Sequence, residues 1–259
     1  MGISVVINTY NEAKNLQECL DSVKGFDEIV VCDMESTDET VEIARRNGCK
    51  TIIFPKGSHT ICEPARNTAI QSASNPWVLV LDADEKITPR LRDYLYAFIE
   101  NPSDVAGLFI PRKNYVMHRF RKSSYPDSQL RFLKRDGSDW PATIHSHPTV
   151  AGRIDRIPSK RTDLALIHKS VSLTDIVERM NRYTSAQAEK KRSKKVNLLS
   201  MIFVPWWFFF KIYILGGSFR YGIAGYIVAK KDAISRFYML AKIYEAQNEA
   251  RFREKERNL

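Results

Sequence analysis

The chain has 259 residues, enough for one large domain or for one domain with an appendage. Hydrophobic residues make up 44% of it and charged residues 27%, a balance typical of a globular protein, which excludes general disorder. The formal net charge of +10 suits an anionic partner, such as nucleic acid, a phospholipid surface or a phosphorylated substrate.

The first residues do not have the features of a signal peptide, because they lack a basic start and their apolar run is short. We therefore expect a protein on the cytoplasmic side of the membrane. The four cysteines show no paired short spacing, so a zinc site is not expected. Cys32 lies in an apolar run and is expected to be a buried free thiol, which indicates a reducing compartment.

In residues 1–100, short apolar runs alternate with segments of helical periodicity. The runs predict strands at residues 3–7, 28–32, 51–54 and 77–81. Helices are expected between them, at residues 11–23, 37–47 and 63–73. Strands that are apolar throughout and separated by helices indicate a parallel sheet covered on both faces. This α/β half is expected to bind a nucleotide at the carboxyl ends of its strands.

From residue 101 to residue 170 the pattern indicates a mixed half that would bind the acceptor. Strands are expected at residues 107–112, 129–134 and 163–168, with a basic aromatic segment at 113–124 and an irregular one at 149–158. We predict one catalytic domain over residues 1–170 and a basic helical region over 171–259. Within that region, helices are expected at residues 174–195 and 230–258.

Residues 196–210 form the most apolar stretch of the chain and directly follow the basic run 189–195. The stretch carries no charge and contains Pro205, Trp206 and Trp207. It is shorter than the roughly 20 residues that a spanning helix needs. We therefore expect a segment that dips into the interface of an anionic leaflet. The alternative is a buried helix that covers the sheet.

The strongest chemical signal is Asp82-Ala83-Asp84, at the end of the fourth strand. Two carboxylates that leave a buried strand are not expected to be satisfied by core packing. A divalent cation would neutralise them and bind a diphosphate at the same time. The alternative is a solvated turn.

Two further motifs point to the same edge of the sheet. Asp33 ends the second strand and could accept a hydrogen bond from a base or a ribose. Ser36 and Asp38, which follow it, are also suited to cap the next helix. Arg66 could form a forked contact with a phosphate, or it could be an ordinary surface arginine.

In their order and spacing, these motifs resemble the family-two glycosyltransferases of the GT-A fold: Asn8-Thr9-Tyr10-Asn11-Glu12, Asp33, Arg66-Asn67 and Asp82-Ala83-Asp84. Downstream, the chain is similar to the branch that contains the lipopolysaccharide-core β-1,4-glucosyltransferases. The residues that carry this similarity are Arg112-Lys113-Asn114-Tyr115, Tyr125 to Arg131, His145, His168 and Asn181-Arg182-Tyr183. The resemblance covers nearly the whole chain.

The resemblance implies a GT-A fold, with a Rossmann-like half, a mixed central sheet and C-terminal membrane-associating helices. It implies inverting transfer of a hexose, glucose from UDP-glucose, to a lipid-linked or lipopolysaccharide-core saccharide. Asp84 would ligate Mg²⁺ or Mn²⁺, and His168 would reach the metal or the diphosphate. The implied substrate-binding residues are Thr9, Tyr10, Glu12, Asp33, Arg66, Asp82, Arg131 and His145.

Inversion needs a base that takes the proton of the acceptor hydroxyl. Asp127 resembles the base of relatives that glycosylate polyprenyl phosphate, and we expect it to stay free to accept a proton. The alternative is a turn residue after Pro126. The branch usually has His-Glu where this chain has His145-Ser146-His147, so a histidine remains a second candidate for the base.

Two other functions remain open. One is a glycosyltransferase that charges polyprenyl phosphate, an acceptor that is already an anion. The other is a nucleic-acid-binding protein, in which Asp82 and Asp84 would repel phosphate unless a cation is bound. The expected partners are therefore a nucleotide sugar, a glycolipid acceptor and the anionic surface of the cytoplasmic membrane, and not nucleic acid.

Overall fold

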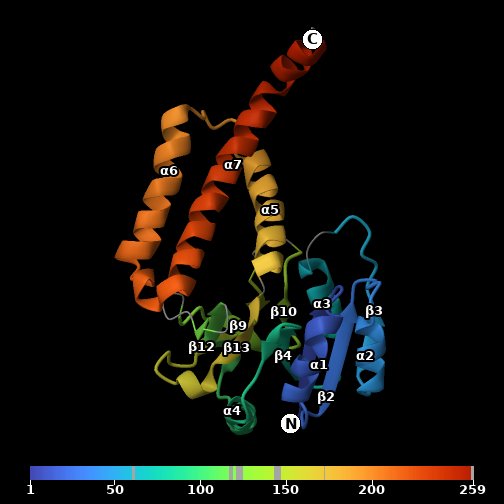
Figure 1. The fold of residues 1–259 in the computed structure, drawn as a ribbon. Coiled ribbons are helices and arrows are strands. Elements are labelled where there is room, and N and C mark those ends of the chain that lie inside the picture. The colour runs from blue at the N-terminus through green and yellow to red at the C-terminus, as the bar shows by residue number, and fades with distance from the viewer. Residues whose placement is uncertain (60–61, 117–118, 121–124, 143–146, 172, 258–259) are drawn as a thin grey trace. The chain divides into compact units, whose positions relative to one another are not determined.

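The computed structural model describes residues 1–259 except 60–61, 117–118, 121–124, 143–146, 172 and 258–259. The chain divides into two compact units. The first contains Met1–Tyr115 and Phe120–Lys169, and the second contains Val116–Arg119 and Ser170–Leu259 (Figure 1). The first unit is an α/β structure and the second is helical.

A seven-stranded sheet forms the middle of the first unit, in the order β12-β6-β9-β4-β1-β2-β3. Strands β1 to β4 run parallel, whereas β9 is antiparallel to both of its neighbours, so the predicted mixed sheet is confirmed. The strands are β1 Ile3–Thr9, β2 Glu28–Asp33, β3 Lys50–Ile53, β4 Trp77–Asp82, β6 Val105–Ile110, β9 Gln129–Lys134 and β12 Arg153–Arg156.

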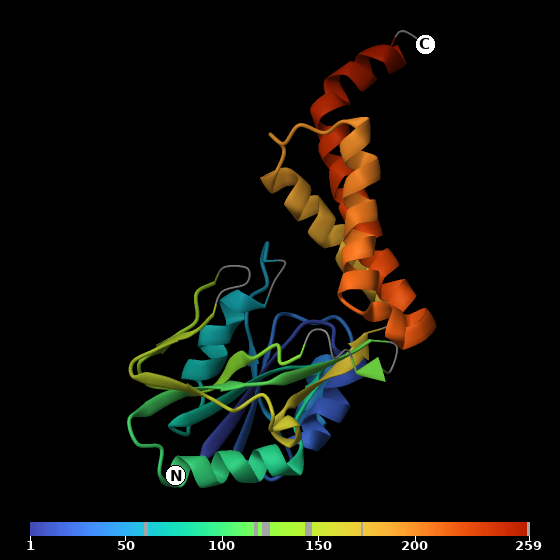
Figure 2. The ribbon, with the colours of Figure 1, turned by 90° about the vertical axis from the view of Figure 1, so that its left-hand side faces the viewer.

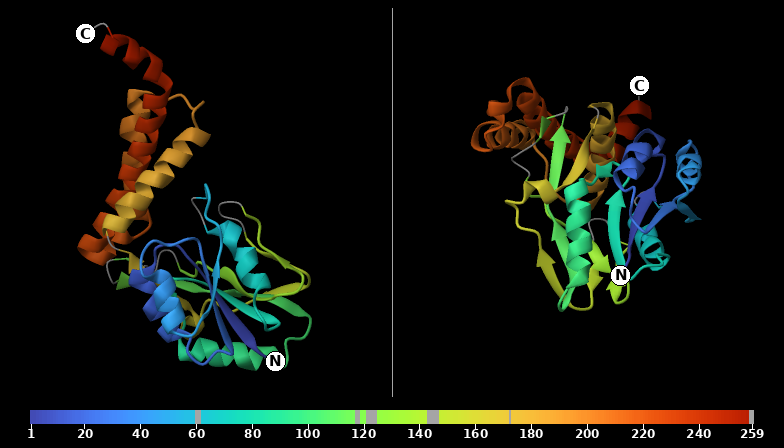
Figure 3. Two further views of the ribbon diagram at one scale, coloured as in Figure 1. Left: turned by 90° about the vertical axis from the view of Figure 1, so that its right-hand side faces the viewer. Right: turned by 90° about the horizontal axis from the view of Figure 1, so that it is seen from below.

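Helices cover both faces of this sheet (Figures 2 and 3). They are α1 Ala13–Ser22, α2 Thr40–Arg46, α3 Glu63–Gln71 and α4 Pro89–Glu100. On β1, Ile3, Val5 and Ile7 pack in one cluster with residues of α1, α2 and α4, while Val6 packs in a second cluster with residues of α3. Because successive side chains of a strand point to opposite faces, both of which are covered, the strand must be apolar throughout.

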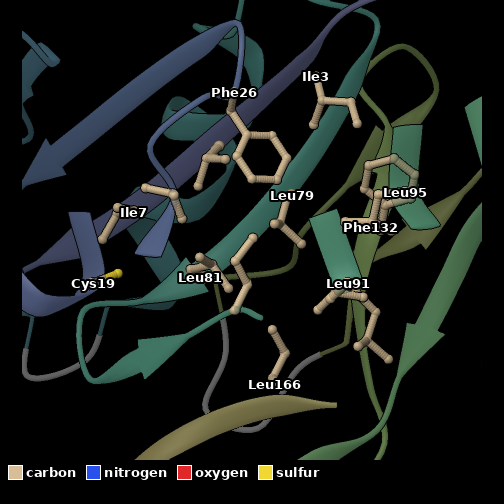
Figure 4. Packing of buried hydrophobic residues seen from close by; sticks show 14 of the residues in the cluster. Ile3, Ile7, Cys19, Phe26, Leu79, Leu81, Leu91, Leu95, Phe132 and Leu166 are labelled. Atoms are coloured by element: carbon tan, nitrogen blue, oxygen red, sulfur yellow. The ribbon is translucent and has the colours of Figure 1, made fainter. Parts of the chain in front are cut away.

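Figure 4 shows the first of these clusters, in which Leu91 and Leu95 of α4 share the core with Leu79 and Leu81 of β4. All four side chains are fully buried. In the same cluster, Phe132 of β9 stacks on Trp77, with ring centroids 4.9 Å apart. Truncating such a side chain to alanine removes roughly 2–5 kcal/mol of stability. The sheet is therefore a rigid support for the polar residues at its carboxyl edge.

A four-stranded sheet, in the order β5-β13-β7-β8, adjoins the end of β4. Its strands are β5 Glu85–Lys86, β13 Leu166–Val171, β7 Arg112–Val116 and β8 Arg119–Phe120. In the register, His168 pairs with Glu85, and the backbone N–H of Lys169 donates to the carbonyl of Asp84 at 2.8 Å. This sheet therefore brings the end of β13 to the acidic motif. A small hairpin, β10 Ser138–Asp139 with β11 Thr149–Val150, completes the unit.

The second unit contains α5 Leu173–Lys190, α6 Leu198–Phe210 and α7 Gly222–Arg257, with a π-helical turn at Lys211–Leu215 and a 3-10 turn at Ser218–Tyr221. Asn197 and Ser200 form a capping box that begins α6. A Cβ on Gly225 would lie 1.8 Å from the carbonyl oxygen of Ser218, so only glycine allows α7 to pack so closely against the 3-10 turn.

Several elements differ from the sequence predictions. No element was predicted over α4, and α7 begins at Gly222 instead of residue 230. The segment predicted at 113–124 contains β8 and all of β7 but its first residue, Arg112. Residues 149–158 contain β11 and β12, and the exposed side chains of β12 show no apolar alternation. No residue of α6 is buried, and the alternative of a helix over residues 196–210 that covers the sheet stays a prediction.

The prediction for Cys32 is confirmed. The side chain is fully buried and forms no disulfide. Burial raises the pKa of the Cys32 thiol to about 12, so the group is a neutral part of the core at physiological pH.

Candidate active site

The candidate active site lies in the first unit, where the carboxyl ends of β1, β2 and β4 meet. Across these strands the register pairs Thr9 with Asp33 and Asn8 with Asp82. Motifs that are far apart in the sequence therefore share one edge of the sheet, which is where an open α/β sheet binds its ligand.

Asp33 is fully buried and holds the loop that follows β2. The Oγ1 of Thr9 donates to its Oδ1 at 2.8 Å, and Ser36 donates from its backbone N–H at 2.7 Å and from its Oγ at 2.6 Å. A buried carboxylate needs such donors. In this structure Asp33 and Thr9 position the loop, and their contact with a nucleotide stays a prediction.

Tyr10 presents a partly exposed ring at the same edge, and Lys56 Nζ lies 4.9 Å from its centroid. The next residue, Asn11, has a φ of 53°, in the left-handed region that asparagine tolerates. The Oε2 of Glu12 accepts a hydrogen bond from Asn15 at 2.7 Å. An accessible ring beside a cation is suited to stack on a nucleobase, and the implied role of Tyr10 in substrate binding stays a prediction.

Asp82 is held between two arginines. Arg66 Nη2 lies 2.6 Å from its Oδ1, and Arg131 Nη2 contacts its Oδ2. Burial alone would raise the pKa of Asp82, but the charges of Arg131 and Arg66 outweigh it and hold the pKa well below its usual range. Asp82 is therefore ionised and compensated by protein side chains. The prediction that a cation must neutralise both acids of the motif is wrong for Asp82.

Arg66 and Arg131 are themselves buried and flank the indole of Trp140, at 4.6 Å and 5.9 Å from its ring centroid. The alternative of a surface arginine is thus wrong for Arg66. The Nε and Nη1 atoms of both arginines are buried and have no hydrogen-bond partner among the described residues. Buried donors without acceptors are rare, so these groups are suited to an anionic ligand.

Arg112 connects two further carboxylates. Its Nη1 lies 2.7 Å from the Oε1 of the fully buried Glu85, and its Nη2 and Nε lie 2.8 and 3.0 Å from the Oδ2 of Asp127. Glu85 also accepts a hydrogen bond from the backbone N–H of Asp82 at 3.1 Å. Arg112 therefore ties the residue predicted as the base to the acidic motif at the end of β4.

Asp127 is more constrained than the sequence predicts. Its Oδ2 accepts hydrogen bonds from Arg112 and from Asn114, and its Oδ1 accepts one from Gln129 at 3.0 Å. Burial alone would raise the pKa of Asp127, but the hydrogen bond of Asn114 and the charge of Arg112 outweigh it and lower the pKa. Asp127 is thus held by three side chains, and its role as the base that accepts a proton stays a prediction.

Asp84 and His168, the two predicted metal ligands, lie together. His168 Nε2 is 3.2 Å from Asp84 Oδ2, and His168 Nδ1 is 2.8 Å from the Oδ1 of Asn114. Burial alone would lower the pKa of His168, but the adjacent carboxylate of Asp84 outweighs it and raises the pKa. Both ring nitrogens thus face an acceptor in this structure.

The donor set fits a divalent cation. Two ligands at a right angle around a cation with bonds of about 2.1 Å are roughly 3 Å apart, close to the separation seen here. One carboxylate oxygen and one imidazole suit Mn²⁺ or Mg²⁺. Within the described part of the chain, no three His, Cys, Asp or Glu residues form a metal site. The remaining ligands would therefore have to be water and substrate phosphate.

The charges around Asp84 and His168 also fit a divalent cation. With His168 neutral, four carboxylates and three guanidiniums leave one formal negative charge in this cluster: Asp82, Asp84, Glu85 and Asp127 against Arg66, Arg112 and Arg131. A cation that arrives with a nucleotide diphosphate would meet an acidic position within a region that is otherwise compensated.

Two groups of residues complete the comparison with the sequence predictions. His145 lies outside the described residues, and His147 is exposed. No role was predicted for Glu85, Arg112 or Asn114, although they contact residues that were predicted. Glu85 directly follows the acidic motif, and Arg112 and Asn114 alternate on one strand, which were the available signals.

The mixed sheet, the helices on both faces and the acidic motif at the end of β4 define a GT-A glycosyltransferase. The chain belongs to glycosyl transferase family 2, whose profile matches residues 4–157. It is 30% identical to an uncharacterized glycosyltransferase of Rickettsia felis, over 94% of this chain and 90% of the relative. It is 24% identical to the lipopolysaccharide core biosynthesis glycosyltransferase LpsC of Rhizobium meliloti, over 94% of this chain and 92% of that protein.

Solved structures share the fold. The mannosyltransferase PcManGT from Pyrobaculum calidifontis, in complex with GDP-Man and Mn²⁺, superposes with a TM-score of 0.53 at 16% identity, over 94% of this chain and 86% of that one. Residues 1–349 of TarS from S. aureus superpose with a TM-score of 0.50 at 20% identity, over 90% of each chain. At these identities the likeness establishes the fold.

Proposed function

We propose that this glycosyltransferase is an inverting, metal-dependent hexosyltransferase that moves glucose from UDP-glucose to a lipid-linked or lipopolysaccharide-core saccharide. The observation that carries the proposal is the Asp84–His168 pair, which is separated from the carboxylate of Asp127 by a single amide, that of Asn114. A cation site and a candidate base are thus close enough to act on the two sides of one sugar.

The donor side is supported by the edge of the main sheet. Tyr10 offers a ring for the base, and the unpaired guanidinium nitrogens of Arg66 and Arg131 offer donors for phosphate oxygens. When bound, Mg²⁺ or Mn²⁺ would balance the charge that grows on the leaving diphosphate. The complex of PcManGT with GDP-Man and Mn²⁺ is consistent with this, and the choice of uridine rests on the resemblance of the sequence.

On the acceptor side, Oδ1 of Asp127 is the oxygen suited to act as the base. Among the described residues it accepts one hydrogen bond, from Gln129, whereas Oδ2 accepts those of Arg112 and Asn114. As the acceptor oxygen bonds to the anomeric carbon, its proton passes to Oδ1, and the bond to the diphosphate breaks on the opposite face of the sugar. The donors on Oδ2 fix the carboxylate in place for this step.

The acceptor is proposed to be a lipid-anchored saccharide because of the second unit. The side chains of α6 are exposed, including Leu198 at 73% and Trp206 at 60%. Helices α6 and α7 also line a groove of about 530 Å³, whose walls are apolar and aromatic apart from Lys230. Such a surface suits the hydrocarbon of a lipid.

We propose that the protein is cytoplasmic and binds the membrane peripherally through α6. The segment Leu198–Leu215 is apolar and long enough to cross a membrane, and none of it is buried within the structure. An interfacial position is favoured by Trp206 and Trp207 and by Lys211, which ends the apolar run after the 13 residues of α6. The basic residues just before α6 would add attraction to an anionic leaflet.

A transfer assay with three acceptors tests the proposal. The full-length protein is incubated with radiolabelled UDP-glucose and Mn²⁺, and with truncated lipopolysaccharide, polyprenyl phosphate or no acceptor. We expect label in the truncated lipopolysaccharide, in line with the similarity to LpsC. Label in polyprenyl phosphate alone would favour the second candidate function, and transfer from another nucleotide sugar would correct the donor.

A further inference from the structure

Asn114 occupies a position between the two halves of the candidate site. It lies on β7, and its amide contacts two of the predicted functional residues at once. Its Nδ2 is 2.7 Å from Asp127 Oδ2, and its Oδ1 is 2.8 Å from His168 Nδ1. His168 Nε2 is in turn 3.2 Å from Asp84 Oδ2. One short planar group therefore joins the candidate base to the candidate metal ligands.

The chemistry of these groups fixes the orientation of the amide. An ionised carboxylate only accepts hydrogen bonds, so the NH₂ group of Asn114 must face Asp127. Its carbonyl oxygen must then face His168, and because a carbonyl also only accepts, His168 Nδ1 must carry a proton. In a neutral imidazole with a proton on Nδ1, the lone pair is on Nε2, the nitrogen that faces Asp84.

We propose that Asn114 is a positioning residue that holds His168 in the tautomer whose Nε2 can ligate a cation together with Asp84. The same amide holds the Oδ2 side of Asp127. The inference rests on the metal use of the proposed function. Partners of this kind orient metal-bound histidines, and their loss typically weakens metal affinity or activity by 10–100-fold.

The two contacts of Asn114 differ in how well the neighbours can replace them. Asp127 Oδ2 also accepts two hydrogen bonds from Arg112, so it keeps a cationic partner when the amide is removed. Substitution by aspartate separates the two roles, because a carboxylate still accepts from His168 Nδ1 but offers no donor to Asp127 and repels it. Asn114→Ala should therefore mainly impair the cation site, and Asn114→Asp should mainly impair the base.

The test measures Mn²⁺ affinity in the presence of UDP, from the electron paramagnetic resonance signal of free Mn²⁺, alongside kcat. For Asn114→Ala we expect Mn²⁺ affinity to fall by about 10–100-fold. For Asn114→Asp we expect Mn²⁺ affinity to stay within a few-fold of the wild type while kcat falls. The matched control is Asn47→Ala, which removes an amide that contacts Gln17 and the carbonyl of Ile43 at the end of α2 and should change neither quantity.

Each outcome decides between the inference and the proposed function. Asn114→Ala with wild-type Mn²⁺ affinity, or Asn114→Asp with the same loss as Asn114→Ala, would overturn the inference and leave the proposed function standing. A wild-type protein that binds no Mn²⁺ with UDP would overturn the metal use and the inference together. Because aspartate is nearly isosteric with asparagine, the aspartate variant keeps the test valid if the alanine variant does not fold.

Discussion

The two units differ in the kind of side chain whose position is energetically unfavourable without a partner: buried charges in the first and exposed apolar groups in the second. In the first, charged side chains such as Glu85 and Arg131 lie inside the protein and are compensated by one another. In the second, large apolar side chains such as Phe203 and Trp206 lie outside it, with no covering element among the described residues of that unit. Burying a charge requires a partner within the fold, whereas exposing an apolar helix indicates a partner outside it. The first unit therefore points to chemistry, and the second to a surface.

The largest expected effect comes from removing the charge of Asp127, which tests whether the first unit carries out the chemistry. We expect Asp127→Asn to lower kcat by about 10²–10⁴-fold, because the acceptor hydroxyl loses its base. The carbonyl oxygen of the asparagine can still accept from Arg112 and Asn114, whereas the hydrogen bond that Gln129 donates to Oδ1 is lost. Transfer from UDP-glucose, measured at saturating donor and acceptor, checks this. The control is Asp136→Asn, an exposed acid of the same unit that pairs with Arg135. Unchanged kcat in Asp127→Asn would exclude it as the base and favour the histidine.

The acidic motif gives the next largest effect. Asp84→Asn should lower kcat/KM by about 10²–10³-fold, because the charge of the leaving diphosphate loses its counterpart. The melting temperature should change little, because asparagine is nearly isosteric with aspartate. The matched control is Asp104→Asn, whose carboxylate pairs with Arg153 on the surface. Full activity of Asp84→Asn with added Mn²⁺ would contradict a metal role for this residue.

Removing one of the buried charges of the first unit should lower its stability. Arg131→Met leaves Asp82 and Glu85 each with one cationic partner fewer, and breaking a buried pair removes about 3–5 kcal/mol from the free energy of unfolding. Urea denaturation at neutral pH checks this, with the exposed Arg153→Met as the control that should unfold like the wild type. A midpoint for Arg131→Met equal to that of the wild type would contradict the compensation described for the first unit.

The ion pair between Asp82 and Arg131 also predicts how stability depends on pH. The pKa of Asp82 is lowered in the folded state, so its contribution is fully present above the unfolded value of about 3.9 and is lost as the pH falls below it. The free energy of unfolding of the wild type should thus fall more steeply below about pH 4 than that of Arg131→Met, whose Asp82 is less depressed. Parallel curves for the two proteins in acid would argue against it.

The sequence predicts the strands of the nucleotide half well, because a strand buried on both faces is apolar along its whole length, as β1 and β4 are. It does not predict β12, whose four side chains are exposed, since pairing of an edge strand leaves no hydrophobic pattern. The start of α4 does have a local signal in the sequence, because Thr88 caps the helix and Pro89 occupies its first turn.

In the candidate site, too, the sequence predicts the position of a residue on its strand but not its contacts with distant residues. That Asp82 and Asp84 stand at the end of a strand follows from the sequence, but their different partners do not. Arg131, which contacts Asp82, is 49 residues away along the chain, and His168, which contacts Asp84, is 84 residues away. Such distant pairs depend on the register of β9 and β13, which no local pattern encodes. This is why both acids were expected to need a cation, although Arg66 and Arg131 already compensate Asp82.

The smallest expected effect concerns the second unit. Phe203→Ser with Trp206→Ser should weaken binding to vesicles of anionic phospholipid by about tenfold or more, since each apolar side chain contributes roughly 1.5–3 kcal/mol on full burial. Co-sedimentation measures this, with Ile53→Ser, an exposed residue of β3 in the first unit, as the control. Wild-type protein that alkaline carbonate fails to release from native membranes would favour a spanning segment over the interfacial one.

The central claim is that Asp84 and His168 hold a divalent cation that arrives with a nucleotide diphosphate. Its most direct test is the melting temperature of the wild-type protein with UDP, with Mn²⁺, and with both. Because a ligand that binds the native state stabilises it, we predict a rise with both together that exceeds the sum of the separate rises, and the loss of this excess in Asp84→Asn. Equal melting temperatures under all three conditions, or the same excess in Asp84→Asn, would contradict the claim.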